Sequence, residues 1–373
     1  MTKFCNITAN KEAGQRRTSY RRLCDSPQGA DIPLFAQAWW LDAACPEEWT
    51  VLTCPDRPEC SDGGSETAYR EDAAKNVWPK AAMPVHTPYG NTVRMALFTQ
   101  NTSIYLPPVN QTKEQKILEE LADALSRYRY VQVQFPPEQR QAQPFYWHGM
   151  DLCVRYTYRL ERLRTWREQG GPESIENALL DGMSRGRQRL RLAERQALRV
   201  KTCTTAEMTD LYRAIFARQG IRKKSHETAR LERLIETTLQ RRQGSLWGCY
   251  DADGRLQSAA FIAWQGRTAY YVAGGSRKKN PHAQTLVLYK AITSCAAFCD
   301  IFDFEGSMIK GIAQFFRGFG AVPCPYIVLS GRKPDLFTRA WRKLGRRFKK
   351  RPASDAGEPS GNTPIPDNRP PQI

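Results

Sequence analysis

The feature that most constrains the fold is a run of three apolar segments, separated by turn signals, between residues 246 and 275. LWGCY (246–250) is followed by the turn residues DADG, RLQSAAFIAW (255–264) is followed by QGR, and TAYYVAGG (268–275) ends on a glycine pair. Short apolar runs bounded by Gly and Asp are typical of strands joined by hairpins. We therefore expect three consecutive antiparallel strands in this part of the chain.

Helical and strand patterns flank these three strands in a regular order. The segments predicted from their apolar spacing are a strand at 196–203, helices at 205–219 and 227–242, a helix at 284–298, a strand at 300–305, a helix at 309–319 and a strand at 325–330. The second half is thus predicted to be a unit of the order β, α, α, β, β, β, α, β, α, β.

The first half repeats the later part of this order in weaker form. Its predicted elements are strands at 49–54, 80–90, 93–99, 130–135 and 150–160, a helix at 113–128 and a basic helical connector at 174–196. With 373 residues, the chain is long enough for two domains with separate cores. We predict an α/β (α+β) fold of two tandem domains, each a mixed, largely antiparallel sheet flanked by helices.

The predicted organisation has five parts. They are an N-terminal segment at 1–30, a first domain at 31–165, a second domain at 166–332, a basic helix at 333–351 and a disordered tail at 352–373. The segment before the tail places Leu336, Trp341 and Phe348 on one helical face and Arg and Lys on the other. Such a helix can lie on an anionic membrane, contact RNA, or dock on its own domain with a solvated basic face.

Charge and cysteine content limit the function classes. The formal net charge is +18, which predicts anionic partners such as phosphate groups, nucleic acid or an acidic membrane surface. The eleven cysteines show no metal-ligand spacing, so we read most of them as buried apolar residues and expect no metal site. No apolar run approaches the length of a membrane span, and the first residues lack a secretory signal, so we expect a cytoplasmic protein.

Several stretches together resemble a known family. They are AWWLDAAC near the N-terminus, LFTQNTSIYLPP, RGRQRLRLAER in the connector, and FDFEGS followed by GIAQFFRGFGA. Their order and spacing resemble the GNAT superfamily of acyltransferases in the tandem arrangement of Fem-like peptidyltransferases, close to the CelD/BcsL-like branch. The resemblance covers roughly residues 33 to 332. It implies two GNAT-like domains, of which the first is degenerate and the second carries the donor site.

The resemblance also implies a reaction. Members of this superfamily transfer an acyl or aminoacyl group to an amine, from acetyl-CoA in ordinary members and from aminoacyl-tRNA in Fem-like ones, whose acceptor is a peptidoglycan precursor. We therefore expect an N-acyltransferase with an acyl-CoA or aminoacyl-tRNA donor substrate, an amine acceptor on a cell-envelope or polysaccharide precursor, and no tightly bound cofactor. DNA is not an expected partner; tRNA is, and so is an anionic membrane at the inner face, contacted by 333–351.

The donor loop of the CoA-dependent members corresponds here to SRKKNPHAQTLVLYKAI. Those members hold pyrophosphate on backbone N–H groups at a helix N-terminus. In this sequence Pro281 lacks an N–H, while His282 and Gln284 occupy the expected glycine or alanine positions. Arg277, Lys278 and Lys279 can hold an anion through their side chains, and a solvated basic turn is the alternative.

The strand at 300–305 offers the clearest acid–base groups. Asp303 and Glu305 alternate, so both should point to one face while Phe302 and Phe304 point to the other. Either carboxylate can take a proton from the acceptor amine or bind it, or else it caps nearby backbone N–H groups. Tyr271 is a further candidate as a proton donor, with Tyr270 beside it.

Three arginines are candidates for contacts with the substrates. Fem-like relatives often have a Lys where this chain has Phe316, and Arg317, which follows one residue later and is rotated by about 100° on a helix, is the candidate for a phosphate or donor contact. In the connector, Arg187 and Arg191 share a helical face and can clamp a substrate phosphate, or they belong to a solvated basic helix. The rival to an enzyme is a non-catalytic GNAT-like module that binds RNA or anionic lipid.

Overall fold

The computed structural model describes residues 2–54, 80–277 and 280–332. The helix predicted at 333–351 and the tail at 352–373 lie outside these ranges. The described residues belong to one compact unit, Met1–Arg332. The domain boundary at residue 165 stays a prediction. Within the described ranges, no helix is both long enough and apolar enough to cross a membrane.

The order predicted for the second half is confirmed. Its elements are β6 (Arg199–Thr202), α8 (Thr205–Arg218), α9 (Ser225–Gln240), β7 (Gly244–Tyr250), β8 (Leu256–Gln265), β9 (Thr268–Ser276), α10 (Pro281–Ala296), β10 (Ile301–Gly306), α11 (Lys310–Arg317) and β11 (Val322–Arg332). Hydrogen bonds between side chains and the backbone determine where several of these helices and strands begin. For example, Thr204 and Glu207 form a capping box that starts α8, and the Asp251 carboxylate accepts two backbone N–H bonds in the turn before β8.

The first half agrees with prediction in part. Its elements are α1 (Thr2–Cys24), α2 (Ala38–Ala44), β1 (Trp49–Cys54), β2 (Ala81–His86), β3 (Thr92–Val93), α4 (Gln111–Ser126), β4 (Tyr130–Gln134), α5 (Gln143–Trp147), β5 (Asp151–Leu160), α6 (Leu163–Gly182) and α7 (Gly186–Arg195). The strand predicted at 93–99 was wrong beyond Val93, because Thr99 closes a turn on Ala96 and Phe98 has a φ of 59°. No prediction was made for α1, α2 or α5.

Strands from both halves form one nine-stranded sheet in the order β3-β4-β11-β5-β10-β9-β8-β7-β6. Two pairs, β3 with β4 and β9 with β10, are parallel and the others are antiparallel, so the mixed, largely antiparallel character is confirmed. The last strand, β11, lies between β4 and β5 of the first half, and β5 pairs with β10 of the second half. Residues of the two halves therefore meet along β5 and β10.

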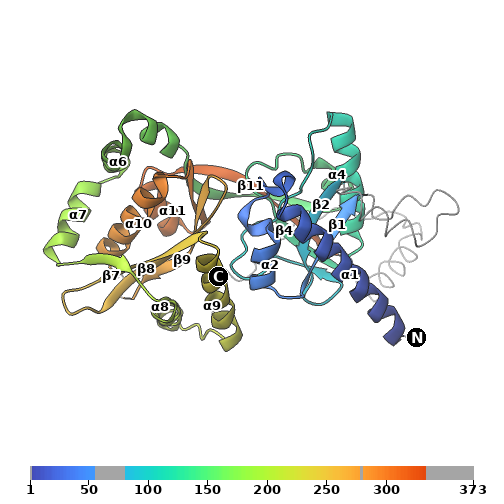
Figure 1. Cartoon of the computed structure of the whole chain (residues 1–373), viewed down its shortest axis with the longest axis horizontal. Helices are drawn as coiled ribbons and strands as arrows, with labels where there is room; N and C mark the ends of the chain where they lie inside the picture. Colours follow the sequence, from blue (N-terminus) through green and yellow to red (C-terminus); the bar gives the residue numbers. More distant parts are fainter. Residues whose placement is uncertain (1, 55–79, 278–279, 333–373) are drawn as a thin grey trace, which may run out of the picture. The chain divides into compact units, whose positions relative to one another are not determined.

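Helices cover both faces of the sheet (Figure 1). α10 packs with β8, β9 and β10 in one apolar core, and α8 and α9 pack on the opposite face in another core that also includes residues of α1 and α2. A third core joins α4 and α5 to β1, β2 and β4. The separate two-stranded sheet of β1 and β2 belongs to the first half.

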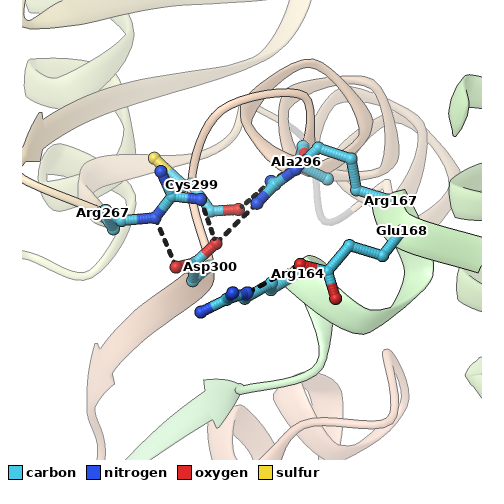
Figure 2. A network of polar contacts seen from close by, with 7 residues as sticks. All are labelled: Arg164, Arg167, Glu168, Arg267, Ala296, Cys299 and Asp300. Atoms are coloured by element: carbon cyan, nitrogen blue, oxygen red, sulfur yellow. Dashed lines mark hydrogen bonds and ion pairs between the residues drawn. The ribbon is translucent and has the colours of Figure 1, made fainter.

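A polar network fixes the start of β10 at Asp300 (Figure 2). The guanidinium of Arg267 donates to both Asp300 oxygens, and Arg167 Nη2 donates to Oδ1 at 2.6 Å. Arg167 also donates to the carbonyl oxygens of Ala296 and Cys299 at the end of α10, at 2.7 and 2.8 Å. The bonds from Arg267, with those from Arg167, lower the pKa of Asp300 to about 2. This carboxylate is fully engaged in holding α6, α10 and β10 together.

Candidate active site

The candidate site lies at the end of β10, which is flanked by β9 and β5. The parallel strands β9 and β10 pair only over Thr268–Tyr270 and Ile301–Asp303. On its other side, the register of β10 against β5 shifts between Asp303 and Gly306, and Glu305 adopts a φ of 66°. A left-handed conformation costs an ordinary residue roughly 1–2 kcal/mol, so the surrounding contacts must hold Glu305 in place.

Asp303 supplies those contacts. Its Oδ2 accepts a bond from Arg159 Nε at 2.6 Å, and its Oδ1 accepts from the Thr157 hydroxyl and from the Glu305 backbone N–H at 2.8 Å. Arg159 is buried and also pairs with Glu138. Both oxygens of Asp303 are therefore engaged by protein groups, and this residue fixes the end of the strand.

Glu305 has a different environment. It is 8% exposed, and its Oε1 has no hydrogen-bond partner among the described residues. Burial and the nearby Asp303 carboxylate raise the pKa of Glu305 well above its ordinary value, although Arg159 opposes them. A buried carboxyl group with a raised pKa is suited to accept a proton from an amine near neutral pH.

Glu305 lines a pocket to which both halves of the chain contribute. The pocket holds about 260 Å³, including the part open to solvent. Its lining residues are Gln100, Asn101, Gln134, Phe135, Pro137, Thr157, Asp303, Glu305, Gly306 and Tyr326. Asn101 Oδ1 is a second buried oxygen without a partner in the described part of the chain. Burial raises the pKa of Tyr326 to about 12, so its hydroxyl remains protonated and can donate a hydrogen bond.

Tyr271 lies on the other face of the sheet. Side chains alternate along β9, so Tyr270, which is paired with Asp303, shares the face of the carboxylates and Tyr271 does not. The Tyr271 hydroxyl accepts a bond from Gln284 at 3.0 Å, and its ring contacts Phe316. The structure therefore brings Asp303 and Glu305 together but places Tyr271 apart from them.

The N-terminus of α10 satisfies its own backbone groups. The Asn280 side chain accepts from the N–H groups of His282 and Ala283 at 3.0 and 3.1 Å, and the Gln284 N–H donates to the Asn280 carbonyl at 3.3 Å. Pro281 has no N–H to offer. A phosphate group at this helix end would have to displace the cap or bind through side chains.

The basic turn before α10 is described in part. Arg277 is exposed, and its carbonyl oxygen accepts a bond from Arg218 Nη1 at 2.6 Å. Arg218 also donates to the Ser276 carbonyl at 3.1 Å, which ties α8 to this turn. Lys278 and Lys279 lie outside the described residues. Two of the predicted donor-binding cations thus have no structural description.

Phe316 and Arg317 have separate roles on α11. Phe316 is buried against Phe304, with ring centroids 4.9 Å apart, and also contacts Tyr158. Arg317 is exposed, and its guanidinium lies 5.8 Å from the Tyr158 ring centroid. The position where Fem-like relatives have Lys is therefore part of the core here.

The connector arginines lie on the exposed surface of α7. Arg187 pairs with Asp181 at 2.7 Å, and Arg191 is exposed on the same helix. An exposed pair of this kind stabilises a protein by less than about 1 kcal/mol. A substrate phosphate that recruited Arg187 would have to compete with Asp181.

Sequence reasoning missed several residues that line the pocket, and also Arg159, which binds Asp303. Thr157 and Arg159 alternate on a predicted strand, and a buried arginine among apolar strand residues is a recognisable signal for a carboxylate partner. Asn101 and Tyr326 carried no such signal, because the contribution of a loop in the first half and of β11 depends on the order of strands in the sheet. Asn101 lies in LFTQNTSIYLPP, a stretch that contributes to the family resemblance, but nothing in its sequence marks Asn101 as a site residue.

Comparisons with known proteins agree with this architecture. Residues 183–316 match a family model described as an acetyltransferase (GNAT) domain. The fold is similar to that of FemX, with a TM-score of 0.53 and 10% identity over 84% of this chain and 95% of that chain. A tandem GNAT protein from the clavulanic acid biosynthesis pathway gives a TM-score of 0.47 at 11% identity, over 86% and 96% of the two chains. No curated protein matches the sequence.

The resemblance expected from the sequence is confirmed by the family model and by the fold. The GNAT match covers α7 through most of α11, and it includes Asp303, Glu305 and Gly306 of β10 among the residues that line the pocket. Residues 183–316 match the GNAT domain model, and the fold of the chain is similar to that of FemX.

Proposed function

We propose that the protein is an N-acyltransferase that moves an acyl or aminoacyl group from a carrier to an amine, with the pocket at Glu305 as the acceptor site. The observation that carries the proposal is the buried Glu305 carboxyl group, whose Oε1 has no partner among the described residues and which lines a pocket in a GNAT-related fold. A buried polar atom without a partner costs free energy, so its retention suggests use by a ligand.

The chemistry requires a neutral amine. Glu305 takes one proton from the acceptor ammonium, and the nitrogen lone pair then attacks the acyl carbonyl carbon. A C–N bond forms, and the C–S bond of a thioester or the C–O bond of an ester breaks. The second nitrogen proton passes to the departing thiolate or alkoxide, and Glu305 returns its proton to solvent. In this scheme Glu305 acts as the base and Asp303 holds it in position.

The donor is an acyl-CoA or an aminoacyl-tRNA. Self-capping of the α10 N-terminus removes the usual backbone cradle for pyrophosphate, so either donor would depend on side chains such as Arg277. The Fem-like fold supports an acceptor on a cell-envelope or polysaccharide precursor, encountered at the inner face of the membrane.

A donor screen tests the proposal. Purified protein is offered acyl-CoAs and charged tRNAs with amine-bearing envelope precursors, and products are read by mass spectrometry. We expect a transferred acyl mass with wild-type protein and with the exposed control Glu236→Gln, and a 10²–10⁴-fold lower rate with Glu305→Gln. Equal rates in all three proteins would remove Glu305 from the mechanism.

The capped α10 N-terminus also favours a second candidate, a non-catalytic module that binds RNA or anionic lipid. Such a module would give no transferred mass in the screen. RNA binding driven by phosphate contacts would weaken steeply as salt rises. Binding that does not change with salt would count against this candidate.

A further inference from the structure

We infer that α5, β5 and α11 form a surface that binds an anionic membrane, on the side of the sheet opposite the pocket at Glu305. The inference goes beyond the proposed function because it assigns a binding surface, and it holds whether or not acyl transfer occurs. It is also separate from the contact expected through 333–351, which lies outside the described residues.

Most of the exposed apolar residues gather on three segments. Fourteen large hydrophobic residues are exposed in the described ranges, and eight of them belong to α5, β5 and the start of α11. On the first two segments they are Tyr146, Trp147, Leu152, Val154 and Tyr156. Single exposed apolar residues are ordinary, but a group of this size marks an interaction surface. Trp and Tyr are also enriched where proteins meet the membrane–water interface.

The three segments lie on one side of the sheet. The apolar residues of β5 share the phase of Tyr158, whose ring centroid lies 6.0 Å from that of Phe316 on α11. α5 is on the same side, because Leu329, the partner of Leu152, belongs to one core with Phe145 of α5. The exposed face of β5 is therefore flanked by α5 and α11.

The charges of β5 point to the other side. Its charged residues are Asp151, Arg155 and Arg159. All three alternate with the apolar residues and share the phase of Thr157, which lines the pocket. On that side Arg155 is hydrogen-bonded to Tyr326, and Arg159 is paired with Asp303. The apolar face of β5 therefore carries no charge of its own.

The start of α11 adds apolar residues and a positive charge. Met308, Ile309 and Ile312 are exposed, and so is Lys310 between them. The segment Gly306–Arg317 contains no Asp or Glu. An apolar surface whose neighbouring charges are positive suits a bilayer with anionic head groups.

Arginines continue the positive charge beyond the end of α11. The Ser184 N–H donates to the Gly318 carbonyl oxygen at 2.9 Å, so the start of α7 lies against the end of α11. The exposed arginines here are Arg185, Arg187, Arg191 and Arg317. Of these, only Arg187 is ion-paired in the described part of the chain, with Asp181. The other guanidinium groups can bind lipid phosphates.

A second copy of the chain fits this surface less well than a bilayer does. Each chain has a net charge of +18, so two copies would repel each other, whereas anionic lipids would attract the protein. The two occupants also respond oppositely to salt. Screening weakens attraction to an anionic bilayer and relieves repulsion between two chains.

Flotation of the full chain with lipid vesicles tests the inference. The probes are vesicles of phosphatidylglycerol and phosphatidylcholine in about equal parts, and vesicles of phosphatidylcholine alone, at about 0.1 M salt. We expect the wild type to bind the anionic vesicles at least about 10-fold more tightly, and this binding to weaken as salt rises.

Variants then assign the surface. Ile312→Asp and Val154→Asp should each weaken binding to anionic vesicles about 10-fold or more, because each loses apolar contact and adds a charge that the lipids repel. Ile312→Leu should bind like the wild type. Ile221→Asp is the matched control, since Ile221 is 41% exposed like Ile312 but lies between α8 and α9 on the other side of the sheet. It should stay within about 2-fold of the wild type. Thermal unfolding confirms that each variant is folded.

Three results would overturn the inference. One is a wild type that does not bind anionic vesicles, or that binds both kinds equally. The second is Ile312→Asp and Val154→Asp binding like Ile221→Asp, which would place membrane binding elsewhere, for example at 333–351. The third is a dimer in sedimentation that Ile312→Asp dissociates, because a second copy would then cover the surface. No donor is present in these measurements, so membrane binding without a transferred mass would reject the proposed function and leave the membrane surface standing.

Discussion

Two carboxylates at the opposite ends of β10 have opposite environments. Asp300 precedes the strand and receives bonds from Arg167 and Arg267, which lower its pKa to about 2 (Figure 2). Glu305 lies near the end of the strand with an unpartnered oxygen, and burial raises its pKa. The first arrangement stabilises the fold, whereas the second is costly unless a ligand completes it.

Hydrogen-bond satisfaction distinguishes the carboxylates that protein groups hold from Glu305, which we propose as the catalytic base. Asp303 resembles Asp300 in this respect, because both of its carboxylate oxygens accept hydrogen bonds from protein groups. Hydrogen bonds are also satisfied within the protein at the α10 N-terminus, where the Asn280 side chain accepts bonds from the backbone N–H groups of His282 and Ala283. Substitutions at these positions should therefore differ in their effects on stability and on turnover.

Removal of Asp303 should have the largest effect on stability. Asp303→Ala leaves the buried Arg159 with only the exposed Glu138 as partner, so we expect the free energy of unfolding to fall by about 3 kcal/mol. Urea denaturation measures it. A loss below about 1 kcal/mol, as for a surface ion pair, would show that Asp303 does not fix the strand end.

Asp300→Asn should have the next largest effect. Because the folded-state pKa of Asp300 is about 2 and its ordinary value is 3.8, its stabilisation is present above pH 3.8 and is lost as pH falls toward 2. We expect a loss of about 1–2 kcal/mol at pH 7 after allowance for partial solvent exposure. Asp253→Asn, an exposed control, should change little. A difference between Asp300→Asn and wild type that does not shrink toward pH 2 would contradict the assignment.

Asn280→Ala should have a smaller effect. It removes the oxygen that accepts two N–H bonds at the start of α10, and loss of such a cap costs about 1 kcal/mol. Thermal unfolding beside Asn91→Ala, at an exposed turn residue, measures the difference. Equal stability of the two variants would show that the helix end does not depend on its own cap.

Glu305→Gln should affect stability with the opposite sign. The raised folded-state pKa means that ionisation of Glu305 destabilises the fold as pH rises through that value, while below pH 4.5 the penalty is absent. We expect the variant to be more stable than the wild type at pH 8 and equally stable at pH 4. A loss of stability at pH 8 would mean that the carboxylate has a structural partner.

The sequence was sufficient for much of the fold because strong local patterns marked the second half. Turn residues bounded β7, β8 and β9, and alternation correctly placed Asp303 and Glu305 opposite Phe302 and Phe304. The insertion of β11 between β4 and β5 was not predictable in this way, since strand order depends on contacts between distant segments.

The site was predictable only in outline. Asp303 and Glu305 were equal candidates in the sequence, and only the geometry distinguishes them, because Arg159 and Thr157 come from β5. The sequence did not show which of the two adjacent tyrosines, Tyr270 or Tyr271, shares the face of the sheet with Asp303. Asn101 could not have been selected, since a loop residue of the first half reaches the pocket only through the shared sheet.

The most direct test of the account measures turnover and stability together in Glu305→Gln and Asp300→Asn. Once the donor screen has identified a reaction, we expect Glu305→Gln to lose 10²–10⁴-fold in kcat while it keeps or gains stability at pH 8. Asp300→Asn should lose stability and retain turnover at temperatures where it is folded. Normal turnover in a folded Glu305→Gln protein would contradict the central claim that the unsatisfied carboxylate is the catalytic one.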